Sequence, residues 1–204
     1  MSGPGTARVI GVDFDNTLIS YDSVFHGLAL EAGLIGPGDP AGKQAARAAA
    51  RRSPGGDLAW QALQGQAYGP RIHEAEPAPG AKAFLAGCLA AGLRVLVISH
   101  KTLYATVDPS RTPMRQAALD WLAAQGFPPL EVRFGATRQE KLAHIREAGC
   151  THFIDDLAET FLEPGFPAQV QGILYAPGTD PAPDLPGVLI ARSWAEISRR
   201  ILDA

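Results

Sequence analysis

Apolar and polar positions alternate along the chain in blocks whose spacing predicts strands and helices in turn. A short apolar run rich in β-branched residues begins at Val9 and predicts a buried strand. Further apolar runs predict strands at 94–98, 131–134, 151–154, 170–175 and 188–191. Helical spacing and glycine stops predict helices at 81–91, 112–125, 138–148, 157–162 and 194–202. Because these strands alternate with helices, we expect an α/β fold with a Rossmann-like parallel sheet flanked by helices on both faces.

The region between residues 19 and 79 has a different texture. It is rich in Ala, Gly, Gln and Arg, contains no convincing strand, and shows helical stretches at 23–32, 41–52 and 57–66. Clusters of glycine and proline separate these stretches. We therefore expect a small helical cap at 19–79, inserted after the first strand of an α/β core that comprises 1–18 and 80–204.

Length and composition limit the size of the fold and the kinds of partner that the protein could bind. A chain of 204 residues can build one sizeable core and a small insert, but not two full domains. The net charge of −3 and the sequence pI of about 5.9 favour neither nucleic acid nor an anionic membrane as a partner. The sequence leaves the oligomeric state open between monomer and homodimer.

The sequence also bears on cellular location. No apolar run approaches the length of a membrane span, and residues 1–8 lack the apolar segment of a secretory signal, so we expect a cytoplasmic protein. Cys88 and Cys150 show no metal-ligand spacing. We expect both to be buried thiols in a reducing compartment.

The first predicted strand ends in two aspartates, Asp13 and Asp15. In a strand, this spacing would point both carboxylates the same way, but Asn16 indicates that the chain is already turning. Open α/β sheets bind ligands at the carboxyl ends of their strands, and two carboxylates that lie together there need a cation or a proton to compensate them. The pattern favours a Mg²⁺ site with a nucleophilic aspartate. The alternative is an acidic turn that merely ends a strand.

Three later features occupy comparable positions. Ser99 follows a predicted strand, and Lys141 lies in the first turn of a predicted helix. Asp155 and Asp156 end another predicted strand. Each feature has a simpler interpretation, respectively a loop hydroxyl, a solvated lysine and a helix N-cap. The N-cap would account for one aspartate of the pair but not for both.

The order Asp-x-Asp-x-Thr, Ser, Lys, Asp-Asp, with each acidic or hydroxyl element at a strand end, resembles the haloacid dehalogenase superfamily of phosphotransfer enzymes. The resemblance covers about residues 8–192, and the insert resembles the helical C1-type cap of that family. It implies that Asp13 is a nucleophile that forms an aspartyl-phosphate, and that Asp15 is the general acid and base. It also implies that Thr17 hydrogen-bonds Asp15 and fixes the turn at the substrate.

The same resemblance implies a metal and a phosphate-binding set. Mg²⁺ would bind Asp13, Asp156 and the carbonyl of the second aspartate, with Asp155 in the water-mediated shell. Ser99 and Lys141 would bind the phosphoryl oxygens of the substrate.

The second aspartate of the first motif discriminates within the superfamily. By this resemblance, dehalogenating members lack an aspartate at the Asp15 position, and phosphonate-cleaving members usually lack it too. We therefore expect a Mg²⁺-dependent phosphatase that hydrolyses a small phosphorylated metabolite. A phosphomutase of the same superfamily remains open, because mutases share this aspartate.

Two classes of different activity also compete. One is a phospho-accepting receiver-like domain, whose acceptor aspartate would lie on a mid-chain strand, yet the strand at 94–98 carries no aspartate. The other is a catalytically idle binding domain, although no motif residue is missing. After Ser99, the neighbours His100 and Lys101 either contact the leaving group or are solvated loop residues, and the solvated interpretation is the simpler one.

A cationic stripe lies in the predicted helix at 41–52, formed by Lys43, Arg47 and Arg51 at i, i+4 and i+8, with Arg52 adjacent. The simpler interpretation is a solvated helix face. The alternative is that the stripe, with Tyr21, His26 or His73, binds the non-reacting part of a small anionic substrate when the cap closes.

Overall fold

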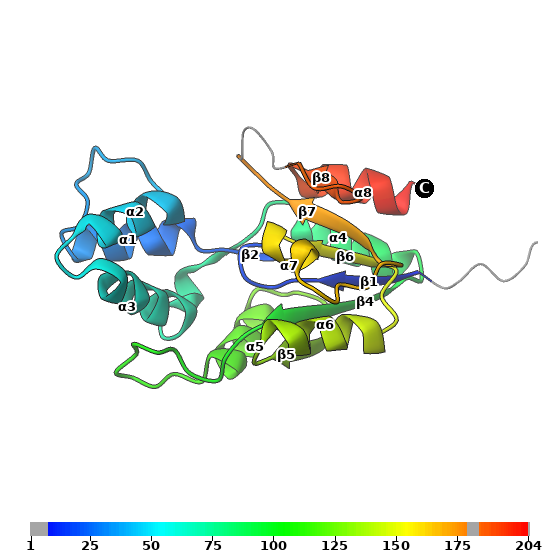
Figure 1. Cartoon of the computed structure of the whole chain (residues 1–204), viewed down its shortest axis with the longest axis horizontal. Coiled ribbons are helices and arrows are strands. Elements are labelled where there is room, and N and C mark those ends of the chain that lie inside the picture. Colours follow the sequence, from blue (N-terminus) through cyan, green and yellow to red (C-terminus); the bar gives the residue numbers. More distant parts are fainter. Residues whose placement is uncertain (1–7, 179–183, 204) are drawn as a thin grey trace, which may run out of the picture. The chain divides into compact units, whose positions relative to one another are not determined.

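The described residues of the computed structural model, 8–178 and 184–203, divide into two units (Figure 1). One unit holds the described residues of 1–18, 77–101 and 128–204, and the other holds Ile19–Glu76 and Thr102–Phe127. The predicted boundaries at residues 18 and 80 lie close to boundaries of these units. Residues 102–127 group with the second unit, which the sequence pattern did not indicate.

The first unit is built on a parallel sheet of six strands in the order β5-β4-β1-β6-β7-β8. The strands are β1 (Val9–Val12), β4 (Arg94–His100), β5 (Glu131–Gly135), β6 (His152–Asp155), β7 (Gln171–Tyr175) and β8 (Leu189–Ala191). Strand β1 lies between β4 and β6, with Val12 paired to Val97 on one side and to Ile154 on the other. The predicted α/β fold with a parallel sheet is confirmed.

Helices cover both faces of this sheet. They are α4 (Ala81–Ala90), α6 (Arg138–Glu147), α7 (Ala158–Leu162) and α8 (Trp194–Leu202). On one face, Leu142 and Ile145 of α6 are buried against Leu96 of the sheet. On the other face lie α4 and α8 (Figure 1), where the rings of Phe84 and Trp194 have centroids 5.1 Å apart. Each such fully buried side chain contributes about 1.5–3 kcal/mol, so the strand ends that carry the motifs rest on a rigid base.

The second unit is mainly helical. Its helices are α1 (Asp22–Glu31), α2 (Lys43–Arg52), α3 (Gly56–Tyr68), η1 (Ile72–Glu74) and α5 (Met114–Ala124). Aromatic side chains form its core, with the Phe25 ring stacked on Trp60 at 4.9 Å between centroids. The indole of Trp121 on α5 donates to the carbonyl of Ala75 at 3.0 Å, which ties α5 to this unit.

Two features of the second unit depart from the sequence pattern. Strands β2 (Ile19–Ser20) and β3 (Glu76–Pro77) pair as a small sheet, so the expectation of no strand at 19–79 is wrong. With two residues each, these strands are too short to show an alternating pattern. The segment after β4 packs on α3 at Gly65, where a Cβ atom would lie 1.9 Å from the carbonyl oxygen of Val107. Only glycine permits this close approach.

Cys88 and Cys150 are free and buried, as predicted, and burial raises the pKa of each thiol to about 11. Both thiols therefore stay protonated at neutral pH. No helix in the described ranges combines the length and the apolar character that crossing a bilayer would require.

Candidate active site

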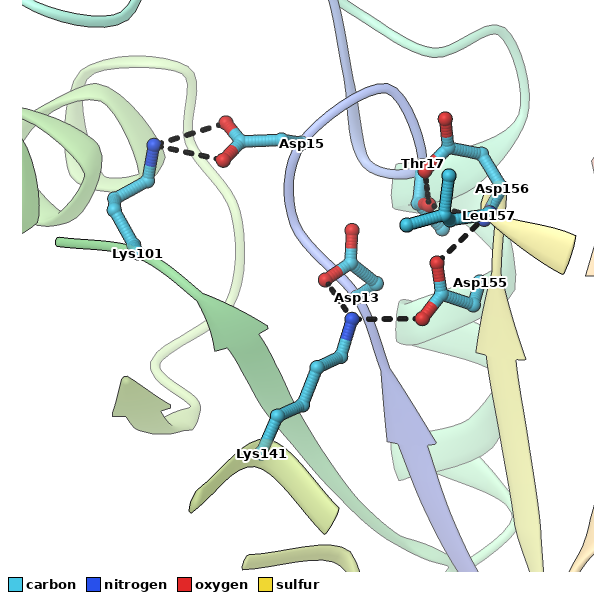
Figure 2. Close-up of polar contacts among 8 residues, drawn as sticks. All are labelled: Asp13, Asp15, Thr17, Lys101, Lys141, Asp155, Asp156 and Leu157. Carbon is cyan, nitrogen blue, oxygen red and sulfur yellow. Dashed lines mark hydrogen bonds and ion pairs between the residues drawn. The ribbon is translucent and has the colours of Figure 1, made fainter. Parts of the chain in front are cut away.

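The turn that follows β1 places Asp13 and Asp15. The backbone N–H of Asp13 donates to the Ile154 carbonyl at 2.8 Å, which keeps Asp13 attached to the neighbouring strand β6. Asn16 has a φ of 59°, in the left-handed region that asparagine tolerates better than most residues, so the predicted turn is confirmed. The side chain of Asp13 lies beside Lys141, whereas that of Asp15 points toward Lys101 (Figure 2).

Three buried charged groups meet at the centre of the site (Figure 2). The Nζ atom of Lys141 lies 2.7 Å from Oδ1 of Asp13 and 2.7 Å from Oδ2 of Asp155. The exposed fractions are 4% for Asp13, 5% for Lys141 and 1% for Asp155. Charges this deeply buried are costly unless they are paired, and these contacts supply the pairing. The alternative of a solvated Lys141 is therefore wrong.

Local sequence explains how α6 presents Lys141. Thr137 caps the helix by accepting from the backbone N–H of Glu140 at 3.1 Å, and the Glu140 carboxylate accepts from the N–H of Ala136 at 2.7 Å. This reciprocal arrangement resembles a capping box and fixes where the helix begins. A Cβ atom on Gly135 would lie 2.7 Å from the backbone nitrogen of Lys141, so the end of β5 needs glycine to pass this close to the first turn of α6.

The electrostatics of this centre are unbalanced. Burial raises the pKa of Asp13 to about 7, with further upward contributions from the carboxylates of Asp155 and Asp15, while Lys141 opposes the rise. Burial alone would lower the pKa of Lys141, but Asp13 and Asp155 outweigh it and the pKa is raised. Lys141 is therefore charged at neutral pH. Asp13 at the same pH is a mixture of the carboxylate and the carboxylic acid.

The end of β6 carries the second acidic pair. Oδ1 of Asp155 accepts from the N–H of Leu157 at 2.9 Å, and so turns the chain toward α7. The hydroxyl of Thr17 accepts from the N–H of Asp156 at 3.1 Å and donates to Oδ1 of Asp156 at 3.4 Å. The expected bond from Thr17 to Asp15 is therefore wrong, since this hydroxyl instead joins the β1 turn to Asp156.

Three of the carboxylates form a cluster that suits a hard cation. Asp13, Asp155 and Asp156 each offer one oxygen, and these oxygens lie within 4.8 Å of one another. Carboxylate oxygens are the ligands that Mg²⁺ prefers. The raised pKa of Asp13 is a second sign of fit, because a cation would relieve the crowding that causes part of it. Asp155 lies within the cluster as well as Asp156, although Lys141 already contacts it.

Strand β4 and the residue directly after it contribute two buried polar side chains. Ser99 is 1% exposed and lies two residues beyond Val97, which pairs with β1. Lys101 is 3% exposed, and its Nζ atom lies 3.0 Å from Oδ1 and 2.8 Å from Oδ2 of Asp15. His100 between them is exposed, with Nε2 3.0 Å from the Ala136 carbonyl oxygen.

The solvated interpretation is therefore correct for His100 and wrong for Lys101. A signal for Lys101 was present in the sequence. Ser99 and Lys101 repeat the i, i+2 spacing of Asp13 and Asp15 on the paired strand.

The cationic stripe of α2 is not a uniform solvated face. The Nζ atom of Lys43 lies 5.8 Å from the ring centroids of both Phe25 and Tyr68, and Nε of Arg51 pairs with Asp57 at 2.8 Å. The other residues of the proposed surface differ in exposure: Arg47, Arg52 and His73 are exposed, His26 is half-buried and Tyr21 is buried.

Comparison with solved structures identifies the fold. No protein-family model and no curated protein matches the chain in sequence. The structure has the fold of the haloacid dehalogenase (HAD) superfamily hydrolases, as the four motifs predicted.

Three of the similar structures illustrate the likeness. A HAD family hydrolase from Deinococcus radiodurans with bound phosphate and sodium is 13% identical, with 98% of this chain and 97% of that chain covered and a TM-score of 0.57. A predicted phosphoglycolate phosphatase from Haemophilus somnus is 14% identical, with coverage of 97% and 99% and a TM-score of 0.57. CbbY from Rhodobacter sphaeroides, in complex with xylulose 1,5-bisphosphate, is 15% identical, with coverage of 94% and 96% and a TM-score of 0.55. At these identities the likeness establishes the fold.

Proposed function

We propose that the protein is a Mg²⁺-dependent phosphatase that hydrolyses a small phosphorylated metabolite through an aspartyl-phosphate. The observation that carries this proposal is the buried Asp13, which contacts Lys141 and shares a carboxylate cluster with Asp155 and Asp156. The bound phosphate of one structural neighbour and the sugar bisphosphate of another support a phosphate ester as the substrate. Residues 19–79 would serve as the helical C1-type cap that the motif resemblance implies.

The reaction would proceed in two balanced halves. In the first, an Oδ atom of Asp13 attacks phosphorus, the bond from phosphorus to the ester oxygen breaks, and Asp15 gives its proton to the departing oxygen. In the second, water attacks the phosphorus of the aspartyl-phosphate while Asp15 takes a proton from that water. The bond between phosphorus and Asp13 then breaks, which releases inorganic phosphate and regenerates the enzyme.

The remaining residues would bind rather than react. Mg²⁺ would be held by Asp13, Asp156 and the carbonyl of Asp15, with Asp155 in the water-mediated shell, and when bound it would supply positive charge against the phosphoryl oxygens. The Lys141 ammonium and the Ser99 hydroxyl would bind phosphoryl oxygens. Both are fixed on rigid elements, which favours phosphoryl transfer because that reaction depends mainly on positioning and charge.

Hydrolysis of para-nitrophenyl phosphate, followed by release of inorganic phosphate, tests this proposal. We expect turnover with Mg²⁺ and its loss in EDTA. The Asp13→Asn variant should lose at least about 10³-fold in kcat while remaining folded, because it removes the nucleophile. The matched control is Asp120→Asn at an exposed position on α5. Full turnover by exhaustively chelated protein or by Asp13→Asn would disprove the mechanism.

A further inference from the structure

Lys101 is a buried cation that the proposed reaction leaves without a task. Its side chain is 2% exposed, and its backbone N–H donates to the Gly135 carbonyl at 2.9 Å, just beyond β4. The Nζ atom lies 5.3 Å from the ring centroid of Phe14, which is fully buried. An ammonium held between a fixed backbone and an aromatic ring has a restricted range of positions.

The ammonium of Lys101 contacts both oxygens of the Asp15 carboxylate, with Nζ 3.0 Å from Oδ1 and 2.8 Å from Oδ2. The double contact to one ammonium sets the direction in which the carboxylate points. Lys141 contacts the other carboxylates, Asp13 and Asp155. Figure 2 shows the Lys101 ammonium beside Asp15 and the Lys141 ammonium between Asp13 and Asp155. The site therefore keeps separate cations for its proposed nucleophile and its proposed acid and base.

We propose that Lys101 is the positioning residue for Asp15, holding its carboxylate in the orientation needed to exchange a proton with the ester oxygen. This inference rests on the proposed function. Proton transfer requires the donor to lie within hydrogen-bond reach of the accepting oxygen, and well-placed general acids contribute about 10²–10⁴-fold to rates. An aspartate without this contact would rotate about its side-chain bonds and spend less time in reach of the leaving oxygen.

Leaving-group dependence distinguishes this role from a structural one. Para-nitrophenolate departs with little help from a proton, whereas the phenolate of phenyl phosphate needs protonation far more. The ratio kcat/KM reports the steps up to the first irreversible one, so it isolates departure of the alcohol from later hydrolysis of the phosphoenzyme. We expect Lys101→Met to lower kcat/KM about 100-fold for phenyl phosphate and less than about 10-fold for para-nitrophenyl phosphate. Lys101→Arg, which keeps the positive charge and can donate to both carboxylate oxygens, should recover part of the loss.

A double-mutant cycle with Asp15→Asn tests whether Lys101 acts through Asp15. In the Asp15→Asn background, Lys101→Met should have no further effect on kcat/KM. Lys82→Met on α4 is the matched control and should equal the wild type, and thermal unfolding of each variant confirms that it is folded. If Lys101→Met does not fold, Lys101→Arg carries the leaving-group comparison.

Three results would each overturn the inference while the phosphatase proposal stands. They are an equal loss of kcat/KM for the two esters, additive effects of Lys101→Met and Asp15→Asn on kcat/KM, and a Lys101→Met variant with the kcat/KM of the wild type. A wild-type protein that hydrolyses neither ester would overturn the proposed function and the inference together.

Discussion

Replacing the proposed nucleophile should stabilise the metal-free protein, and the structure gives the size of the effect. Asp13 is 4% exposed, and its pKa rises from 3.8 to about 7 in the fold. Between these values the folded protein holds a proton that the unfolded chain has released, so stability falls as pH rises from about 4 to about 7. At 1.36 kcal/mol per pH unit, the loss reaches about 4 kcal/mol above pH 7. Asparagine has the same shape and does not titrate.

Thermal unfolding of wild-type and Asp13→Asn protein in EDTA, from pH 5 to pH 8.5, measures this effect. The Asp13→Asn variant should unfold about 10 °C higher at pH 8, since one kcal/mol shifts the Tm of a chain of this size by about 2–4 °C. The difference should shrink toward pH 5, where the folded wild type is protonated. Asp120→Asn, at an exposed position, serves as the control. A difference that does not change with pH, or an Asp13→Asn variant that is less stable at pH 8, would refute the reasoning.

Two further predictions concern the metal and the substrate. Lys141 and the N–H of Leu157 already contact the two carboxylate oxygens of Asp155, so Asp156→Ala should weaken Mg²⁺ binding more than Asp155→Ala does. Calorimetric titration with Mg²⁺ at pH 8 measures this, and the opposite ranking would assign the direct ligand to Asp155. Replacing Lys43, Arg47 and Arg51 with alanine together should raise KM for an anionic metabolite substrate and leave KM for para-nitrophenyl phosphate unchanged, and equal kinetics on both would leave α2 as a solvated face.

The sequence predicted the sheet and the motif positions because both depend on short-range patterns. Apolar runs rich in β-branched residues mark buried parallel strands whatever surrounds them. Strand ends follow where polar residues interrupt the runs, so Asp13, Ser99 and Asp155 were placed correctly at one edge of the sheet. The left-handed Asn16 was also predictable, since a single residue type favours that conformation.

Features that depend on contacts between distant residues escaped the same reasoning. The burial of Lys101 depends on the Gly135 carbonyl and on the carboxylate of Asp15, both far away in sequence. The hydroxyl of Thr17 could reach Asp15 or Asp156, and only the packing of β1 beside β6 selects Asp156. The grouping of α5 with the second unit likewise depends on Trp121 meeting the Ala75 carbonyl.

The charges at the site explain why its stability and its proposed activity oppose each other. The side chains drawn in Figure 2 include four carboxylates and two ammonium groups, so two negative charges remain, which is the charge that one divalent cation balances. Without the cation, the excess is spread over Asp13, Asp155 and Asp156, because Lys101 contacts Asp15 and Lys141 is shared between Asp13 and Asp155. A proton on Asp13 then relieves part of this excess, because the pKa of Asp13 is raised, mainly by burial and further by the carboxylates of Asp155 and Asp15. Proton and Mg²⁺ therefore compete for the same carboxylate, and metal binding should weaken as the pH falls below about 7. Asp13→Asn removes a buried carboxylate that is costly in the metal-free fold and that would also bind the cation. The variant that unfolds at a higher temperature should therefore also be the one that Mg²⁺ no longer stabilises.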